Sequence, residues 1–428
     1  MYFFLDKDVL LVEGAKNSAL YDLKEGTVYS IVPSIKKLLD ALEAGSPVQD
    51  FSTLPEVQLI LNEFAEKGLG FFSEENNKPA KTKIHPPKPK LDMMWLALNS
   101  NCNLVCEHCY ATSEPGPCDG TIPMDRLFLA MKEAREVFNV ECIQLIGGEP
   151  LLLGKNKVQQ IIEYAFKLNT PVIEVFTNGH LIDEFYINLF KEKGVHVAIS
   201  IYSNLEADHD NVTKRKGSWK KTIKAIQTVQ SAGIPLRTGI VAMSSNAQSV
   251  GDTAPWLKKE FGIEHGEKLY DVVRSCGRGN NKDTIPWDLF LEQHIRVKPD
   301  FDLISYESLQ KTMYGNVCWA SEVCIMPNGD VTPCEMEFEH IQGNITTDNL
   351  SEIVLGSGGA MAQRLTKDKI EICKDCEFRY ACWECRAMAH QLDANRFSKP
   401  LTCMYNPHKG EWNNVPEKVE ELFPTINQ

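Results

Sequence analysis

The sequence lacks any long uncharged apolar run, which argues against a membrane-spanning helix. Such a helix needs about 20 mostly apolar residues, and no run in the 428-residue chain approaches that length. The first residues, MYFFLDKDVLLVEG, mix acids with apolar residues and show neither a basic leader nor a small-residue cleavage site. We therefore expect no secretory signal and a cytoplasmic protein with no membrane partner, in a compartment where thiols stay reduced.

Basic residues are also in deficit. The chain has 45 Lys and Arg against 58 Asp and Glu, a formal charge of −13, whereas non-specific nucleic-acid binding depends on basic patches. We expect no nucleic-acid partner. The 14 cysteines lie far below the share of about 8–10% that marks a small disulfide scaffold. Clustered cysteines in a reducing compartment more often bind metal or take part in catalysis.

Residues 1–75 predict a small winged-helix-like α+β domain. Apolar residues between turn signals indicate three short antiparallel strands, over residues 2–14, 18–23 and 27–32. Two helical patterns follow, over 33–45 and 52–68. Residues 76–90 then hold four prolines, five lysines and no acid. This composition is typical of an extended, semi-rigid linker.

Residues 91–280 predict an α/β unit in which strands and helices alternate. The expected strands are 93–99, 142–147, 171–177, 195–202, 235–243 and 268–273, and the expected helices are 124–138, 155–168, 181–193, 217–233 and 249–262. Such alternation gives parallel strands with right-handed crossovers. Six units are too few for a closed eight-stranded barrel, so we expect a partial (β/α)6 barrel or an open sheet. Ligands bind at the C-terminal strand ends of both.

The C-terminal part predicts less regular structure. Residues 281–317 form a bridging segment, residues 318–407 a loop-rich, cysteine-dense domain, and residues 408–428 an acidic tail. No internal repeat is present.

A first cysteine cluster follows the first strand of the α/β unit. SNCNLVCEHCY places Cys102, Cys106 and Cys109 in a C-x3-C-x2-C loop. Three thiolates at this spacing can bind three irons of a [4Fe-4S] cluster and leave the fourth open. Zinc would need a fourth ligand, and His108 is the alternative that the loop offers for it.

This cluster resembles the signature of the radical S-adenosylmethionine (SAM) superfamily. The second strand ends in Gly147, Gly148, Glu149 and Pro150, which is similar to the GGEP motif that holds the methionine amino group in that family. Glycines allow a close approach of backbone, and a carboxylate can bind an ammonium group.

Three further positions extend the resemblance to SAM binding. Asn178 in the segment FTNG and Ser200 end the third and fourth strands, where the family places ribose or methionine contacts. Arg237 on the fifth strand would point into the barrel and pair with the methionine carboxylate. The competing interpretations are a turn residue for Asn178 and a solvated charge for Arg237.

The resemblance implies the chemistry of this site. The open iron would chelate SAM, one-electron reduction would cleave its sulfonium, and the resulting 5′-deoxyadenosyl radical would abstract a substrate hydrogen. The protein must orient the cofactor and exclude water.

A second set of cysteines lies in the C-terminal region. Its eight members suit two four-thiolate clusters: Cys318, Cys324, Cys334, Cys373, Cys376, Cys382, Cys385 and Cys403. The alternative is a pair of structural zinc sites, which C-x2-C pairs also suit. Three cysteines remain: Cys142 is expected in the core, and Cys118 and Cys276 are unassigned.

The spacing of this set resembles the SPASM domain, the auxiliary-cluster extension of radical SAM enzymes that modify peptides and proteins. The resemblance assigns Cys318, Cys324, Cys334 and Cys385 to a first auxiliary [4Fe-4S] cluster, and Cys373, Cys376, Cys382 and Cys403 to a second. Two residues precede Cys385 where three are commoner in the family. An arrangement without Cys385, and with an open iron on the first auxiliary cluster, therefore stays an alternative.

Together these resemblances imply a radical SAM oxidoreductase that matures ribosomally synthesised peptides. Residues 1–75 resemble the peptide-recognition element of such enzymes, to whose sheet edge a leader peptide adds as a strand. We expect hydrogen abstraction from a precursor peptide and formation of a thioether or carbon–carbon crosslink. The cofactors would be SAM and three [4Fe-4S] clusters, with an external one-electron donor such as flavodoxin or ferredoxin.

Other functions stay open on the sequence alone. Formylglycine formation would need a general base, for which Asp208 and Asp210 are candidates unless they are solvated loop acids. Peptide epimerisation would need a hydrogen donor such as the thiol of Cys276. The non-enzymatic alternative is a zinc or electron-transfer iron–sulfur module, against which the GGEP motif argues.

Overall fold

The computed structural model describes residues 1–51, 53, 55–117, 122–301, 303–359, 365–393 and 395–415. Cys118 and much of the predicted acidic tail therefore lie outside the described residues. Within the described part, no helix combines the length and the apolar character that crossing a membrane requires.

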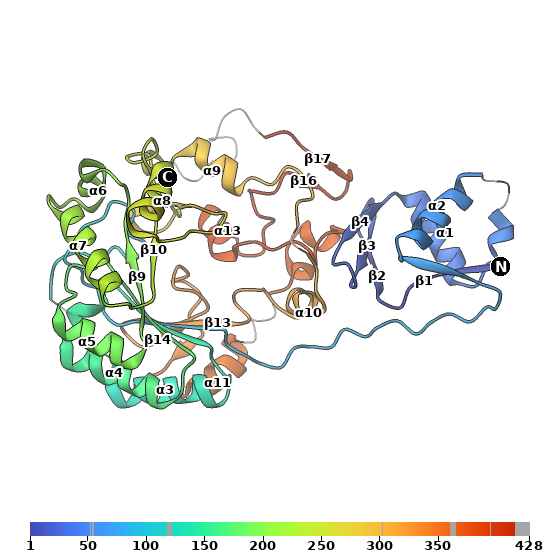
Figure 1. Ribbon diagram of the computed structural model, residues 1–428. Coiled ribbons are helices and arrows are strands. Elements are labelled where there is room, and N and C mark those ends of the chain that lie inside the picture. Colours follow the sequence, from blue (N-terminus) through green and yellow to red (C-terminus); the bar gives the residue numbers. More distant parts are fainter. Residues whose placement is uncertain are drawn as a thin grey trace.

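The N-terminal domain contains two small sheets and two helices (Figure 1). Its elements are β1 (Tyr2–Leu5), β2 (Val9–Glu13), β3 (Ser18–Asp22), β4 (Val28–Ile31), α1 (Pro33–Glu43), α2 (Pro55–Glu66) and β5 (Gly70–Ser73). The prediction of one strand over residues 2–14 is wrong. A turn closed by the bond from Val9 N to Asp6 O (3.1 Å) divides it, so that β1 pairs with β5 and β2 pairs with β3.

The two faces of the β2–β3–β4 sheet pack on different parts of the chain. On one face, Leu20 joins Leu39 and Leu42 of α1 in a buried apolar cluster. On the other face, Ala19 and Tyr21 pack against residues of the C-terminal half, among them Leu309 of α10 (Tyr306–Tyr314). The N-terminal domain is thereby fixed to the C-terminal region, as Figure 1 shows.

Residues 76–90 form an extended connection and run below the N-terminal domain and α10 in Figure 1. Hydrogen bonds hold this linker at both sides. Thr82 N donates to Lys7 O at 2.9 Å, while the hydroxyl groups of Tyr306 and Tyr314 on α10 donate to carbonyl groups of the linker.

The central unit confirms the predicted α/β partial barrel. Its elements are β6 (Met93–Ala97), α3 (Met124–Glu136), β7 (Cys142–Ile146), α4 (Lys155–Lys167), β8 (Val172–Thr177), α5 (Glu184–Lys193), β9 (His196–Ser200), α6 (Glu206–Thr213), α7 (Ser218–Ser231), β10 (Leu236–Gly239), β11 (Val241–Ala242), α8 (Val250–Phe261) and β12 (Asp271–Val272). Strands β6 to β10 are parallel neighbours. The sixth strand, β12, pairs with β11, which continues β10 after one residue. Helix α6 was not predicted.

The C-terminal region extends this sheet on the free side of β6, which the sequence analysis did not predict. Strand β13 (Glu322–Ile325) pairs in parallel with β6, and β14 (Asp330–Thr332) and β15 (Gly343–Asn344) follow as antiparallel neighbours. Among the described residues, the remaining α-helices and strands are short: α9 (Trp287–His294), α11 (Leu350–Leu355), α13 (Arg386–Leu392), β16 (Tyr405–Asn406) and β17 (Glu411–Trp412). Loops make up most of the cysteine-rich part, as predicted.

Side chains alternate between the two faces of the barrel strands. Ile143 and Leu145 of β7 join the core beneath the helices, whereas Ile146 lies with Ala97 of β6 and Cys324 of β13 in a separate cluster on the other face. That other face is the interior of the partial barrel. Strand β13 therefore brings a cysteine of the C-terminal set to the barrel interior.

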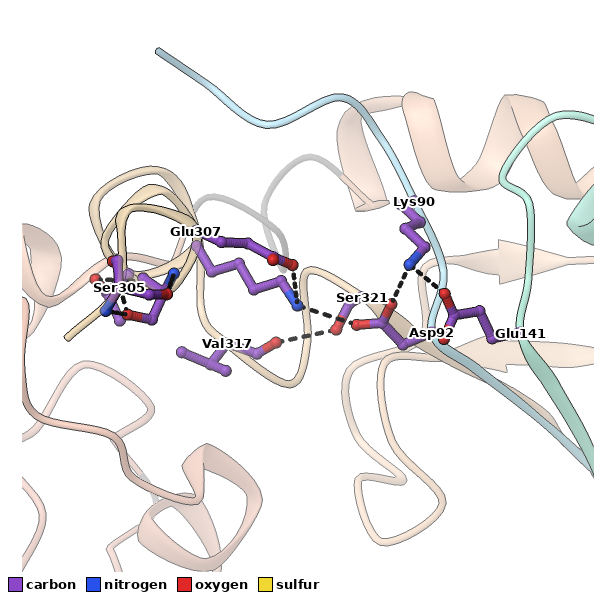
Figure 2. A network of polar contacts seen from close by, with 10 residues as sticks. Lys90, Asp92, Glu141, Ser305, Glu307, Val317 and Ser321 are labelled. Carbon is purple, nitrogen blue, oxygen red and sulfur yellow. Dashed lines mark hydrogen bonds and ion pairs between the residues drawn. The ribbon is translucent and has the colours of Figure 1, made fainter. Parts of the chain in front are cut away.

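A polar network joins the end of the linker to β6 and α10 (Figure 2). The Asp92 carboxylate lies 3.3 Å from the ammonium groups of both Lys90 and Lys311, and its backbone N–H donates to Ser321 O at 2.6 Å. Burial opposes ionisation of Asp92, but the two lysines favour it, and the net effect lowers its pKa. Asp92 thus holds the first barrel strand against two segments distant in sequence.

We predict that Asp92→Asn lowers the free energy of unfolding by about 1 kcal/mol, because two cations lose their shared partner. Glu307→Gln is the matched control. The Glu307 carboxylate also contacts Lys311, at 3.5 Å, but its side chain is 76% exposed, so a change near zero is expected. Urea denaturation of the reduced apoprotein measures both, and equal losses would contradict a special role for Asp92.

Candidate active site

The first cysteine loop lies directly after β6, at the C-terminal edge of the barrel. Cys102 is buried and Cys106 and Cys109 are half-buried. Burial raises the pKa of Cys102 to about 11 and that of Cys106 to about 12, and the charge of Cys109 adds to both shifts. The three sulfurs thus share one poorly solvated site.

The chemistry of this donor set fits an iron–sulfur cluster. Thiols with raised pKa values bind metal only as thiolates, which the positive charge of the irons stabilises. Cys102 Sγ also accepts from Leu104 N at 3.4 Å, the kind of contact that tunes cluster potentials. Among the described residues, no three His, Cys, Asp or Glu side chains converge closely enough for a single metal ion.

A loop over residues 274–279, after β12, clamps the cysteine loop. Arg278 donates from Nε to Cys106 O (2.8 Å), from Nη2 to Ser113 O (2.7 Å) and from its backbone N–H to Cys109 O (3.0 Å). Gly277 has φ +53°, and a Cβ there would lie 2.3 Å from Tyr110 O. Sequence reasoning missed this clamp, whose only signal was the pair of glycines in RSCGRG.

The two glycines of the GGEP segment allow a close contact with the chain that precedes the cysteines. A Cβ on Gly147 would lie 2.6 Å from Asn99 O, and one on Gly148 would lie 2.0 Å from Asn101 O. These glycines therefore have a structural role within the protein, in addition to the ligand approach expected from the sequence.

Glu149 is fully buried and joins the ends of β7 and β8. Its Oε1 accepts from Thr177 Oγ1 (2.7 Å) and Leu151 N (3.2 Å), and its Oε2 accepts from Asn178 N (2.9 Å). Burial raises the pKa of Glu149, and these hydrogen bonds, which lower it, offset only part of that effect. Pro150 follows it and begins a short 3-10 helix, Pro150–Leu153. A buried carboxylate with spare lone pairs at a strand end suits an ammonium ligand.

The structure brings some of the other predicted SAM contacts to this edge. Asn178 Nδ2 lies 3.7 Å from Cys102 Sγ and donates to Asn103 Oδ1 at 2.6 Å. Ser200 ends β9, level with Gly239 of β10. Asn178 thus borders the cysteine loop, and Ser200 borders a neighbouring strand end. Their roles in SAM binding stay predictions.

Arg237 has a protein partner instead of a free guanidinium. Its Nε and Nη2 donate to Glu174 Oε2 and Oε1 of β8 at 2.8 and 2.7 Å, and its guanidinium lies over the ring of Phe176. The predicted pairing with the methionine carboxylate would have to compete with this bidentate ion pair. The Arg237 side chain is also 52% exposed, so the solvated-charge interpretation stays open.

The eight C-terminal cysteines fall into two electrostatic groups. Burial raises the thiol pKa values of six of them: Cys318, Cys324, Cys334, Cys373, Cys376 and Cys403. The charge of Cys385 adds to the raised pKa of both Cys318 and Cys334. The charge of Cys382 adds in the same way to the pKa of Cys373, Cys376 and Cys403. Cys324 is fully buried on β13. This grouping agrees with the predicted ligand sets, which remain assignments by resemblance.

The sequence patterns did not single out most of the residues between the barrel cysteines and the first auxiliary set. Cys276 is buried. Burial raises its pKa to about 12, and the thiols of Cys385 and Cys109 contribute to this shift. Glu335 accepts from Cys334 Sγ at 3.3 Å. Cys276 thus lies between the barrel cysteines and the first auxiliary set, but the structure shows no role for it as a hydrogen donor.

The remaining predictions for single residues need correction. Cys142 is half-buried and does not lie in the core. Burial and the charge of Glu174 together raise its pKa to about 12. Asp208 and Asp210 are not loop acids but lie on α6. The carboxylate of Asp210 accepts from Gly217 N and Trp219 N at the start of α7, which leaves it poorly placed to act as a base.

Comparison with known proteins identifies both parts of the chain. Residues 97–257 match the model of the radical SAM superfamily, and residues 318–377 match the SPASM iron–sulfur cluster-binding domain. The chain therefore contains a radical SAM domain and a SPASM domain. It is an enzyme that uses SAM and a [4Fe-4S] cluster, and its SPASM domain binds auxiliary iron–sulfur clusters.

Individual relatives are distant. The chain is 28% identical over 333 residues to the antilisterial bacteriocin subtilosin biosynthesis protein AlbA of Bacillus subtilis, covering 72% of this chain and 69% of that one. It is 25% identical over 350 residues to the AdoMet-dependent heme synthase of Methanosarcina barkeri, covering 73% and 96%. The crystal structure of Streptococcus suis SuiB bound to its precursor peptide SuiA has the same fold, with a TM-score of 0.56, 12% identity, and coverage of 94% and 100%.

We predict that Glu149→Gln weakens SAM binding at least tenfold without loss of iron. The amide has no charge for the methionine ammonium group, and its NH2 group would face a backbone N–H, at a cost of about 1–3 kcal/mol. Anaerobic equilibrium dialysis with SAM measures the affinity. Thr177→Val, which removes one donor but keeps the carboxylate, should weaken binding less, and equal affinity of Glu149→Gln and wild type would refute the assignment.

Gly277→Ala should displace the clamp loop and release the barrel cluster while the auxiliary clusters remain. The expected iron content after anaerobic reconstitution falls from about twelve to about eight per chain. Gly266→Ala is the control, since a Cβ there would meet nothing within 4 Å. An iron content in Gly277→Ala equal to that of the control would contradict the role of the clamp.

Proposed function

We propose that this enzyme matures a ribosomally synthesised peptide: it abstracts a hydrogen atom from a precursor peptide and installs an intramolecular thioether or carbon–carbon crosslink. One observation carries the proposal. The likeness to peptide-bound SuiB covers 94% of this chain, a share too large to leave out residues 1–75. The proposed peptide-binding domain thus occurs together with the barrel and the SPASM domain. The relation to AlbA, a bacteriocin biosynthesis protein, supports the same substrate class.

Within the barrel, we assign the barrel cluster to Cys102, Cys106 and Cys109, and the SAM amino group to Glu149 with the backbone of Gly147 to Pro150. SAM bound at the reduced cluster would supply a 5′-deoxyadenosyl radical that removes a substrate hydrogen. The protein holds the cluster loop through Arg278 and aligns the strand ends through Glu149. These contacts keep the cofactor end of the site rigid.

The outer edge of β4 is the proposed binding place of a leader peptide. Asp22 N donates to Thr27 O at 2.9 Å, so this pair faces inward, and alternation along the strand turns the backbone groups of Val28 and Ser30 away from β3. Among the described residues, no strand pairs with this edge. An extended peptide could therefore add there through backbone hydrogen bonds.

The proposed domain division is residues 1–75 for leader recognition, 76–90 for the linker, 91–280 for the barrel, 281–317 as a bridge, 318–407 for the SPASM domain and 408–428 for the tail.

Two hydrogen bonds join the N-terminal domain to the SPASM domain. Tyr21 on β3 donates to Glu377 O at 2.9 Å, and Ser30 on β4 donates to Glu377 Oε1 at 3.4 Å. A leader bound at β4 would thus lie beside the SPASM domain, from which the rest of the peptide can reach the barrel.

Two auxiliary clusters, held by the two groups of four cysteines, would take up the electron that crosslinking releases from the substrate radical. An external one-electron donor, such as flavodoxin or ferredoxin, would reduce the barrel cluster at the start of each turnover.

Mass spectrometry of a candidate peptide tests the function. The probe is the product of a short reading frame beside the gene, incubated anaerobically with reconstituted enzyme, SAM and dithionite. A crosslink removes two hydrogen atoms from the peptide and releases 5′-deoxyadenosine. Formylglycine formation from cysteine would remove sulfur, and epimerisation in D2O would add one deuterium. An unmodified peptide together with modification of a porphyrin would overturn the proposal.

Ser30→Pro should abolish leader binding, because proline removes the outward N–H and places its ring at the sheet edge. We expect at least a tenfold loss of affinity by anaerobic fluorescence anisotropy with the labelled leader. Ser30→Ala, which keeps the N–H and loses only the hydroxyl contact to Glu377, should bind within a few-fold of wild type. Equal loss in both variants would place the leader elsewhere.

A further inference from the structure

Cations surround the cysteines assigned to the second auxiliary cluster. Arg296 donates from Nη1 to Cys382 Sγ at 2.8 Å and from Nη2 to Trp383 O at 3.3 Å. Its backbone is fixed by a bridge to Cys403. Lys399 Nζ donates to the carbonyl group of Cys403. A guanidinium in direct contact with a ligand sulfur is the strongest of these features.

A buried charge cluster completes the surroundings on the opposite side. Lys367 Nζ lies 3.1 Å from Glu384 Oε1, and Arg386 Nε lies 3.5 Å from the same atom, with the three side chains 9%, 9% and 1% exposed. Lys367 and Cys382 also line a cavity of about 20 Å³, which is room for about one water molecule. One carboxylate thus faces two cations, and one positive charge is left without an anion.

The hydrogen bonds of this cluster are incomplete. Lys367 Nζ, Arg386 Nε and Arg386 Nη2 are buried donors without a hydrogen-bond partner, and both Glu384 carboxylate oxygens are buried acceptors without one. Buried, poorly satisfied charges are costly unless another charge balances them. Burial lowers the pKa of Lys367, but the charges of Glu384, Cys382 and Cys373 raise it above its ordinary value, so these two thiolates are the further anions that act on Lys367.

The first auxiliary set has different neighbours. Its Cys334 faces the carboxyl group of Glu335, at 3.3 Å, and in the described part of the chain no lysine or arginine donates to the sulfur of Cys318, Cys324, Cys334 or Cys385. Among the described residues, donation from an arginine or lysine to a cysteine sulfur is therefore confined to the second set.

We propose that Lys367, balanced in part by Glu384, acts together with Arg296 to raise the reduction potential of the second auxiliary cluster above that of the first. This inference rests on the ligand sets of the proposed function. Cys373, Cys376, Cys382 and Cys403 would hold the second cluster, which would accept one electron given up by the first cluster, and the added negative charge would lie next to the cations. No proton or further reactant is needed.

The expected effect is large enough to measure. A cation near a redox group stabilises the reduced, more negative state, and the interaction persists because burial limits screening. Removal of the Lys367 charge should lower the ratio of reduced to oxidised second cluster at least tenfold at a fixed potential. For a one-electron couple a tenfold change equals about 59 mV.

Redox titration followed by EPR tests the proposal on the full-length protein. The background variant replaces Cys102, Cys106 and Cys109 by alanine, which leaves only the auxiliary clusters, at about eight irons per chain. Cys376→Ala in this background identifies the signal of the second cluster by its loss. Lys367→Met should lower the potential of that signal and leave the other signal nearly unmoved, whereas Lys367→Arg should stay near the parent value.

Glu384→Gln provides an independent test, because removal of the anion should move the same signal to higher potential. Equal shifts of both signals, no shift, or a downward shift in Glu384→Gln would overturn the proposal. If Lys367→Met fails to retain iron, the sign of the shift in Glu384→Gln decides. Fewer than eight irons in the background variant would refute the ligand sets themselves, and absence of peptide modification would refute the proposed function while these potentials stand.

Discussion

The candidate active site depends on one buried carboxylate. Glu149 accepts from Thr177, Asn178 and Leu151, and its own carbonyl group accepts from Asn99 at 2.9 Å. These bonds connect the ends of three neighbouring strands at the edge where parallel strands bind ligands. A fully buried anion is unfavourable unless it is hydrogen-bonded, so the surrounding donors and the carboxylate constrain each other. The cysteine loop packs against the two glycines that precede Glu149. This arrangement therefore also sets the position of the loop.

A second buried carboxylate organises the contact between the N-terminal and C-terminal domains. Glu377 accepts from the hydroxyl groups of Tyr405 and Ser30, and its backbone carbonyl group accepts from Tyr21. A Cβ on Gly14 would lie 2.7 Å from Glu377 N, so the two backbones approach as closely as glycine permits. Glu377 directly follows Cys376, an assigned ligand of the second auxiliary cluster. The positions of the N-terminal domain and of the assigned ligand loop are therefore set by adjacent residues.

Much of the barrel could be predicted because its evidence is local. Strands β7, β8 and β9 are largely buried on both faces and so appear as apolar runs, and the cysteine and GGEP motifs lie at the ends of apolar runs. Contacts between distant segments left no comparable signal. The pairing of β13 with β6 joins Cys324 to Trp95, and Arg278 reaches Cys106, but neither contact alters the local pattern. Arg237 shows the opposite error: its strand was predicted, but its partner Glu174 lies 63 residues away.

The charge distribution around the assigned clusters bears on the order of electron transfer. The first auxiliary set reaches the barrel interior through Cys324 on β13, and so lies nearer to a substrate radical formed there. The second set lies beside Arg296, which lines a cavity of about 340 Å³ together with the exposed Trp383. Cys382 and Cys385 are separated by only two residues, so the two sets are joined through a short covalent path. On these assignments, an electron that enters near the barrel would meet the charges of Arg296 and Lys367 as it moves outward, and these cations would favour its departure from the substrate over its return.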